Sequence, residues 1–324
     1  MPRTSYEFIR CPICGSSEST EIADSEAMRF EVESLWAFHE ARLREGVPTA
    51  RLADRVAFSQ YPPLRLAQCK ACSHLYRNPS ERHEALEATY NDAILDEGVL
   101  QALFETQRET YRAQAERITA IVGHAGRGLE VGSYVGGFLA AAHDIGWVFE
   151  GLDVNASALK FARKKGFPVT RGEITEFVTE HPFDVIAIWN TFEQLYDVRA
   201  GVTAARRLLR VGGLLAVRTP NAGFYVNWRN HLRGPLSGVA IRMLAHNNLL
   251  SFPYRQGFTK RSLFQLFIHG GFEIVDVFGD TLVPIADSWT TKYGTAEERL
   301  LKHVQRIAQR GWHAPWIEVY ARAI

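Results

Sequence analysis

A short apolar strand that runs into a glycine-rich turn constrains this chain most. Residues 129–139 read Leu-Glu-Val-Gly-Ser-Tyr-Val-Gly-Gly-Phe-Leu, and a second apolar strand, 149–154, contains Asp153. A strand followed by such a turn and a helix brings bare backbone N–H groups close to a ligand, and an acid at the tip of the next strand accepts hydrogen bonds from ribose hydroxyls. This pairing predicts an α/β fold that binds a nucleoside cofactor.

The spacing of the glycines distinguishes between cofactors. Tyr134, not glycine, stands two residues after Gly132, so the dinucleotide pattern G-x-G-x-x-G is absent and NAD is disfavoured. The segment resembles the first motif of class I S-adenosylmethionine-dependent methyltransferases, in which an acid precedes spaced glycines, here Glu130, Gly132 and Gly136. Tyr134 replaces the usual middle glycine of that family, and a residue with a Cβ is less free to adopt positive φ and crowds a ligand.

Later segments resemble the same family in the right order. The stretch 183–190 is an apolar strand opened by an acid, and 208–221 contains a helix end, a Gly-Gly turn and another strand. The stretches 270–278 and 316–323 look like the two closing antiparallel strands. The resemblance covers 125–324 and implies a seven-stranded Rossmann-like sheet with helices on both faces, a methyltransferase activity and S-adenosylmethionine as cofactor.

The resemblance also implies which residues hold the cofactor. Helices between residues 80 and 122 close over it in the resembling families, which makes Tyr90 and Tyr111 candidate contacts, with core packing as the open alternative. Glu173 and Ile174 follow the third strand, an edge that lies beside the adenine. The full predicted set is Tyr111, Glu130, Gly132, Ser133, Tyr134, Gly136, Phe138, Asp153, Val154, Glu173, Ile174 and Asn190.

All four cysteines lie in the first quarter of the chain, as two C-x-x-C pairs. Cys11 and Cys14 form the first pair, Cys69 and Cys72 the second. Four thiolates make a closed tetrahedral site for a structural Zn²⁺. Disulfides are rare in cytosolic proteins, and a redox role would require a strand and a helix around the pair, so both alternatives are weaker.

A cysteine pair ahead of a methyltransferase domain resembles a subset of bacterial methyltransferases, many of which modify natural products or sugars. The match continues past the second pair through Tyr76, Asn78 and Pro79. The chain departs from this subset in the long gap between the pairs. It also lacks the extra C-terminal domain of the sugar C-methyltransferases, which argues against that reaction.

The expected organisation has three parts. Residues 1–80 form a zinc module with a helical insertion at about 24–60, which packs on the module or acts as a lid or homodimer contact. Residues 81–124 form a helical cap. Residues 125–324 form the methyltransferase domain, with an aromatic-rich acceptor lid at 220–256.

Methyl transfer requires alignment, exclusion of water and, for a hydroxyl or carbon acid, a proton acceptor. The resembling families usually have His-x-x-Glu-His after the fourth strand, whereas this chain has Asn190 and Gln194 in place of the histidines and keeps Glu193. His246 matches a lid histidine of the family and is the first predicted base. Glu193 and Tyr225 complete the predicted catalytic set. The alternatives are that Glu193 caps or orients the following helix and that His246 is a solvent-facing or hydrogen-bonded loop residue.

Charge and hydropathy limit the classes of binding partner that we expect for this chain. The chain has 37 basic and 36 acidic residues, so it lacks the electrostatic footprint of a nucleic-acid or anionic-membrane protein. No apolar run has the length of a signal peptide core or a membrane span, and we expect a cytoplasmic enzyme. The prediction is methyl transfer to a small molecule. The alternatives are an RNA or protein methyltransferase, or a non-methylating S-adenosylmethionine-binding protein.

Overall fold

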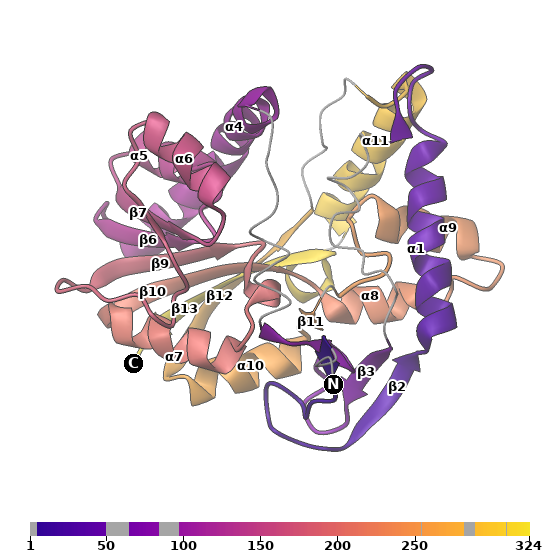
Figure 1. Ribbon diagram of the computed structural model, residues 1–324, viewed down its shortest axis with the longest axis horizontal. Coiled ribbons are helices and arrows are strands. Elements are labelled where there is room, and N and C mark those ends of the chain that lie inside the picture. Colours follow the sequence, from indigo (N-terminus) through magenta and orange to yellow (C-terminus); the bar gives the residue numbers. More distant parts are fainter. Residues whose placement is uncertain (1–4, 50–64, 84–96, 254, 282–288, 309) are drawn as a thin grey trace.

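The computed structural model describes residues 5–49, 65–83, 97–253, 255–281, 289–308 and 310–324. A mixed seven-stranded sheet forms its centre, in the order β12-β13-β10-β9-β6-β7-β8 (Figure 1). Parallel pairing joins β10, β9, β6, β7 and β8, whereas β13 runs antiparallel to both β10 and β12. The strands are β6 (Arg127–Val131), β7 (Val148–Asp153), β8 (Val169–Arg171), β9 (Phe183–Trp189), β10 (Leu209–Pro220), β12 (Phe272–Asp280) and β13 (Trp316–Ala323). The predicted sheet, including its closing antiparallel strands, is confirmed.

Helices cover both faces of this sheet (Figure 1). On one face α4 (Glu97–Val122), α5 (Gly137–His143) and α6 (Ala156–Lys164) bury an aromatic core. On the other face α7 (Val198–Leu208) and α10 (Lys260–His269) bury a second core of aliphatic and phenylalanine side chains. Thr259 is the N-cap of α10 and forms a reciprocal capping box with Ser262. Residues 84–96, which include the candidate contact Tyr90, lie outside the described part of the chain.

A separate helical layer stands at one end of the sheet (Figure 1). We use this name for α1 (Ser25–Glu40), α8 (Ala222–Arg229), α9 (Ser237–Ala245) and α11 (Lys292–Ala308). Helix α1 buries Met28, Val32 and Leu35 at helical spacing, and Asp24 caps its first turn by accepting from Ala27 N at 2.8 Å. The predicted insertion helix therefore exists. It packs on α8 and α9 as well as on the zinc module, a wider contact than the sequence predicts.

The zinc module contains a four-stranded sheet in the order β11-β4-β3-β2. Its strands β2 (Ser19–Ala23), β3 (Leu66–Cys69) and β4 (Leu75–Arg77) come from the N-terminal region, whereas β11 (Gln256–Gly257) comes from the end of the predicted lid. A smaller pair joins β1 (Tyr6–Glu7) to β5 (Ser80–Glu81). Because β11 pairs with β4, the two regions that the sequence separates at residue 80 share one sheet.

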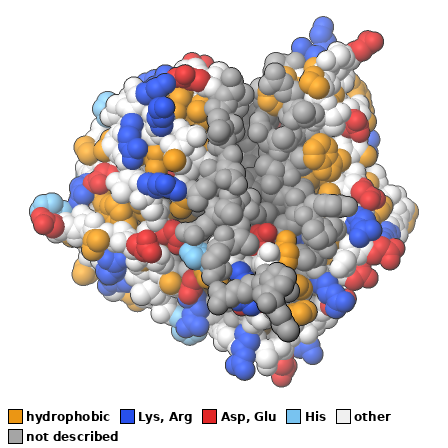
Figure 2. Space-filling model, in the orientation of Figure 1, with side chains coloured by type: hydrophobic (Ala, Val, Ile, Leu, Met, Phe, Trp, Pro, Cys, Tyr) orange, Lys and Arg blue, Asp and Glu red, His pale blue; other side chains and the backbone are white. Residues whose placement is uncertain are grey.

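The surface carries both signs of charge. Basic and acidic side chains are interspersed over the face in Figure 2, with apolar side chains between them. Among the described helices, none combines the length and apolar composition that crossing a bilayer requires.

Candidate functional site

The strand directions gather several polar side chains at one edge of the central sheet, which we call the carboxyl edge. It contains the C-terminal ends of β6, β7, β9, β10 and β12 and the N-terminal end of β13, since Arg218 pairs with both Trp189 and Glu318 and Asp280 pairs with Trp316. Open α/β sheets bind their ligands at such an edge. In the described part of the chain, buried polar atoms without a hydrogen-bond partner recur here, on Glu130, Ser133, Trp189, Asn190, Glu193, Arg218 and Thr281.

The glycine-rich turn after β6 is fixed by close backbone contacts. Gly132 has φ +76°, and a Cβ at this position would lie 2.2 Å from Thr191 Oγ1, so the turn admits no side chain there. Tyr134 adopts φ +45° despite its Cβ, and its N–H donates to Asp153 Oδ2 at 2.8 Å. The turn therefore keeps its positive φ although a tyrosine replaces the middle glycine, and the backbone of Tyr134 is strained.

Asp153 ends β7 next to this turn. Its Oδ2 accepts from Tyr134 N–H and its Oδ1 accepts from Asn155 N–H, each at 2.8 Å. Burial raises the pKa of Asp153, and these backbone donors oppose the shift. Each oxygen keeps a lone pair for a further donor, which fits the two ribose hydroxyls of a nucleoside.

Glu130 lies beneath the same turn. The side chain is buried and its Oε2 has no partner among the described residues. Burial, and then the negative charge of Asp153, raises the pKa of Glu130 well above its usual range. Two neighbouring carboxyl groups, one buried and one half-buried, fit a ligand with positive charge, such as the sulfonium and ammonium groups of S-adenosylmethionine, because a cation relieves the cost of ionising them.

Tyr111 of α4 covers the carboxyl edge beside Glu130. Its ring stacks on Trp189 at 6.2 Å and meets Phe138 edge-to-face at 5.9 Å, and its hydroxyl accepts from Asn190 Nδ2 at 3.4 Å. Asn190 itself has φ +56° and keeps Oδ1 without a partner. The ring of Tyr111 thus packs in the core, one of its two predicted roles, and its role as a cofactor contact stays a prediction.

Glu193 lies on the one-turn helix η2 (Phe192–Gln194), directly after β9. Burial raises its pKa from 4.5 to about 7, against hydrogen bonds from its own backbone and from Thr219 and against the charge of Arg218. Its Oε2 has no hydrogen-bond partner in the described chain. A buried carboxylate with a free oxygen and a pKa near neutrality has the properties of a general base.

Arg218 belongs to this edge although we did not select it from the sequence. Its guanidinium is 2% exposed, lies 3.3 Å from Asp280 Oδ2 and has the ring of Trp316 at 5.5 Å. A signal was present in the sequence, since Arg218 interrupts the apolar run Leu-Leu-Ala-Val of a central strand. A charge in such a run must be paired or functional.

The remaining predicted cofactor residues occupy different environments. Phe138 is fully buried in the core under α4, and Ile174 is buried in the core under α7. Ser133 points into the sheet, where Gly151 leaves room for it. Val154 is half-buried, and Glu173 is 38% exposed with His83 at 3.9 Å. The cofactor roles of these residues stay predictions.

His246 and Tyr225, two of the three predicted catalytic residues, lie in the helical layer. His246 is buried against the ring of Phe38 at 4.9 Å and lies 3.5 Å from Glu297, and burial lowers its pKa from 6.5 to about 4. The hydroxyl of Tyr225 donates to Glu31 Oε2 at 2.8 Å. Their contacts are with α1 and α11, so the geometry does not support the predicted catalytic roles.

The four cysteines meet as their spacing predicts. All four are free, and their sulfur atoms lie within 4.8 Å of one another. The Sγ atoms of Cys11 and Cys72 are 3.5 Å apart, as are those of Cys14 and Cys69. Four converging thiols with little exposure fit a closed tetrahedral Zn²⁺ site.

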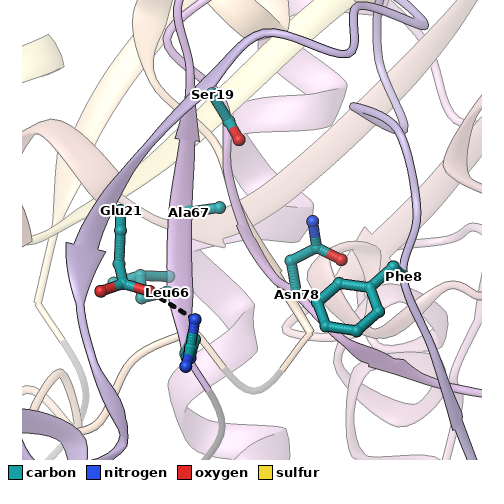
Figure 3. A pocket seen from close by; sticks show the side chains of 7 residues that line it. Phe8, Ser19, Glu21, Leu66, Ala67 and Asn78 are labelled. Carbon is teal, nitrogen blue, oxygen red and sulfur yellow. Dashed lines mark ion pairs between the residues drawn. The ribbon is translucent and has the colours of Figure 1, made fainter.

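A small cavity lies beside the zinc module (Figure 3). It measures about 170 Å³, below the size of typical small-molecule sites, and its lining residues are Phe8, Ser19, Glu21, Arg65, Leu66, Ala67 and Asn78. Glu21 pairs with Arg65 at 3.3 Å, and the Asn78 side chain bonds to both the N–H and the carbonyl of Ile9. These polar groups are already partnered, so we assign the chemistry to the carboxyl edge.

Comparison with known proteins gives one family match. The profile of the methyltransferase domain family matches residues 103–277, more than half of the chain, from α4 through most of β12. A search of curated proteins gives no match.

Several solved structures are similar at low identity. An S-adenosylmethionine-dependent methyltransferase from Thermotoga maritima has a TM-score of 0.46 and 16% identity, over 69% of this chain and 94% of that one. A second, from Archaeoglobus fulgidus, has a TM-score of 0.45 and 16% identity, over 70% and 100%. Magnesium protoporphyrin IX methyltransferase from Synechocystis has a TM-score of 0.45 and 11% identity, over 72% and 91%.

Proposed function

Because the chain belongs to the methyltransferase domain family, as an S-adenosylmethionine-dependent methyltransferase, we propose that its acceptor is a small molecule of the natural-product or sugar-like kind. The observation that carries this proposal is the group of unpartnered buried polar atoms at the carboxyl edge. These atoms lie under α4 and beside the helical layer, in a setting that suits a compact acceptor. On the face in Figure 2 basic side chains of the described residues are interspersed with acidic ones, a pattern that favours a small acceptor over RNA.

The edge divides into a cofactor part and an acceptor part. Gly132, Tyr134, Asp153 and Glu130 would hold S-adenosylmethionine at the ends of β6 and β7, where Asp153 has lone pairs for the ribose hydroxyls. The cofactor supplies an electrophilic methyl group on a sulfonium. Glu193, which follows β9, faces the acceptor part and accepts a proton there.

The protein's own contribution is therefore alignment and proton removal. Positioning converts a bimolecular encounter into an oriented one, and a base with a pKa of about 7, such as Glu193, is ready to accept a proton at neutral pH. We assign this role to Glu193 in place of His246, whose ring is enclosed by Phe38 and Glu297.

Calorimetric titration with S-adenosylmethionine, followed by detection of S-adenosylhomocysteine with acceptor pools, tests the proposal. We expect binding that Asp153→Asn weakens. Asp184→Asn is the matched control, because Asp184 is a carboxylate at the opposite end of β9, bonded to Arg127 N–H and Arg210. Methyl transfer to acceptors in the pools of small molecules, and none to bulk RNA or protein, is the expected result.

Other outcomes would replace the proposal. Turnover with bulk RNA or protein alone would make this a macromolecule methyltransferase. Binding of S-adenosylmethionine without turnover on any acceptor would leave a non-methylating binder. Equal weakening by Asp153→Asn and Asp184→Asn would show that the carboxyl edge is not the cofactor site.

A further inference from the structure

The acceptor part of the carboxyl edge contains a buried cation whose hydrogen-bonding capacity is not filled. Arg218 ends the apolar run of β10 and pairs with Asp280 through Nη1. Its Nε is buried and has no hydrogen-bond partner among the described residues. A guanidinium has five donor hydrogens, and leaving a buried one unused is costly. The free Nε–H is therefore suited to an electron-rich atom of a ligand.

Few of the charged groups around Arg218 are free to accept a hydrogen bond from its Nε–H. Asp280 is its ion-pair partner, and Thr281 N–H already donates to Asp280 Oδ1. Glu318 is occupied, since it accepts from Gln114, Arg117 and Tyr320. The other ionisable groups facing Arg218 are Tyr111 and Glu193.

Glu193 supplies the opposite chemistry within the same part of the edge. Its Oε2 is buried and unpartnered, and it follows β9, the strand that pairs with β10 at Trp189 and Arg218. A group bound here therefore meets a hydrogen-bond donor of fixed positive charge from Arg218 and a proton acceptor from Glu193. An acidic hydroxyl satisfies both, because it gives up a proton and leaves an oxygen with negative charge. An ammonium group satisfies Glu193 and is repelled by Arg218.

On the basis of the proposed function, we propose that Arg218 and Glu193 form the acceptor subsite and select a phenol or enol hydroxyl over an amine, so that the methyl group goes to oxygen. The acceptor O–H bond breaks, and its proton goes to Glu193 Oε2. The acceptor oxygen forms the new bond to the methyl carbon, while the carbon–sulfur electron pair stays on sulfur in S-adenosylhomocysteine. Arg218 is unchanged and stabilises the oxygen's negative charge through Nε–H.

A spectroscopic titration tests the subsite without turnover. Full-length protein saturated with S-adenosylhomocysteine is mixed with 4-nitrophenol, whose anion absorbs visible light, and the pH is varied. We expect the apparent pKa of bound nitrophenol to fall by about one unit or more relative to free nitrophenol. Arg218→Gln should abolish that shift, and Arg218→Lys should retain part of it. Arg322→Gln is the control, since Arg322 lies at the opposite end of β13 and bonds to Gly212 O.

The outcomes separate this inference from the proposed function. Failure of S-adenosylhomocysteine to bind would overturn the function itself. Normal cofactor binding combined with an unshifted nitrophenol pKa, with an equal shift in Arg218→Gln, or with no binding of nitrophenol would overturn the inference alone. Tighter binding of benzylamine than of nitrophenol would do the same. Circular dichroism melts of each variant, with Arg218→Lys as the conservative replacement, exclude loss of folding as the cause.

Discussion

The carboxyl edge and the helical layer both bury charged side chains, but the two regions differ in how those charges are paired. In the helical layer Glu31 is 1% exposed, yet Arg229 lies 2.7 Å away, Tyr225 donates at 2.8 Å and Ser251 N–H donates at 3.0 Å. At the carboxyl edge Glu193 is also buried, but it has no such ion pair among the described residues. Burial alone therefore does not identify a functional carboxylate. The missing ion pair does, because a buried charge that only stabilises the fold is paired.

The largest expected effect is that of Glu193→Gln. Loss of a general base lowers kcat by about 10²–10⁴-fold, measured as S-adenosylhomocysteine formation. Because burial raises the pKa of Glu193 from 4.5 to about 7, the folded state binds its proton more tightly, and stability falls as pH rises between these values. The variant should therefore melt at a higher temperature than the wild type at pH 8. Unchanged kcat would remove Glu193 from the mechanism.

The same replacement in the helical layer should have the opposite effect on stability. Burial raises the pKa of Glu31 too, but Glu31→Gln leaves the Arg229 guanidinium without its ion-pair partner, and that loss should lower the free energy of unfolding by about 3 kcal/mol. Urea denaturation followed by tryptophan fluorescence measures this change. Affinity for S-adenosylmethionine, measured by calorimetry on the folded variant, should stay the same. A stabilised Glu31→Gln protein would abolish the distinction between the two regions.

The pH dependence of turnover gives an effect of intermediate size. Glu193 must be ionised to accept a proton, so kcat should rise with pH, with a midpoint near its pKa of about 7, and fall about tenfold per unit below it. Initial rates from pH 5.5 to 8.5 at saturating substrates provide the profile. A midpoint near 4.5, or the same profile in Glu193→Gln, would assign the base elsewhere.

The smallest effects should come from the residues that the sequence favoured. Tyr225→Phe removes one hydrogen bond to Glu31 and should cost about 1–2 kcal/mol of stability. His246→Gln should likewise act on folding, since its ring packs on Phe38. Both variants should keep kcat within about twofold of wild type. A hundredfold loss of kcat in either would return the helical layer to the catalytic machinery.

Much of the fold was predictable because its signals are local. The glycine turn at 132–136, the acid at the tip of β7 and the Gly-Gly turn before the main part of β10 each lie within a stretch of a few residues, and their order follows the family. The two C-x-x-C pairs were equally informative. Their spacing alone indicates a four-thiolate site, because a bound metal can draw two such pairs together. The capping box at Thr259 and Ser262 depends on neighbouring residues alone.

The roles of single polar residues were less predictable because they depend on distant partners. Tyr225 was a catalytic candidate because it lies in an aromatic segment. Its hydroxyl instead donates a hydrogen bond to Glu31, which is 194 positions away in the chain. Arg218 was overlooked because its partner Asp280 lies on another strand of the sheet. Tyr134 was expected to oppose a positive φ, whereas the hydrogen bond from its N–H to Asp153 supports that conformation.

The two-residue strand β11 connects the zinc module to the segment that carries Glu193. It pairs with β4 of the zinc module, and from it Gln256 Nε2 donates at 2.9 Å to Leu195 O, two residues after Glu193. Zinc bound at the four thiolates would add folding free energy to the module, and β11 is the element through which that module contacts the segment of Glu193. The position of Glu193 is therefore supported from outside the central sheet, by a strand that belongs to the sheet of the zinc module.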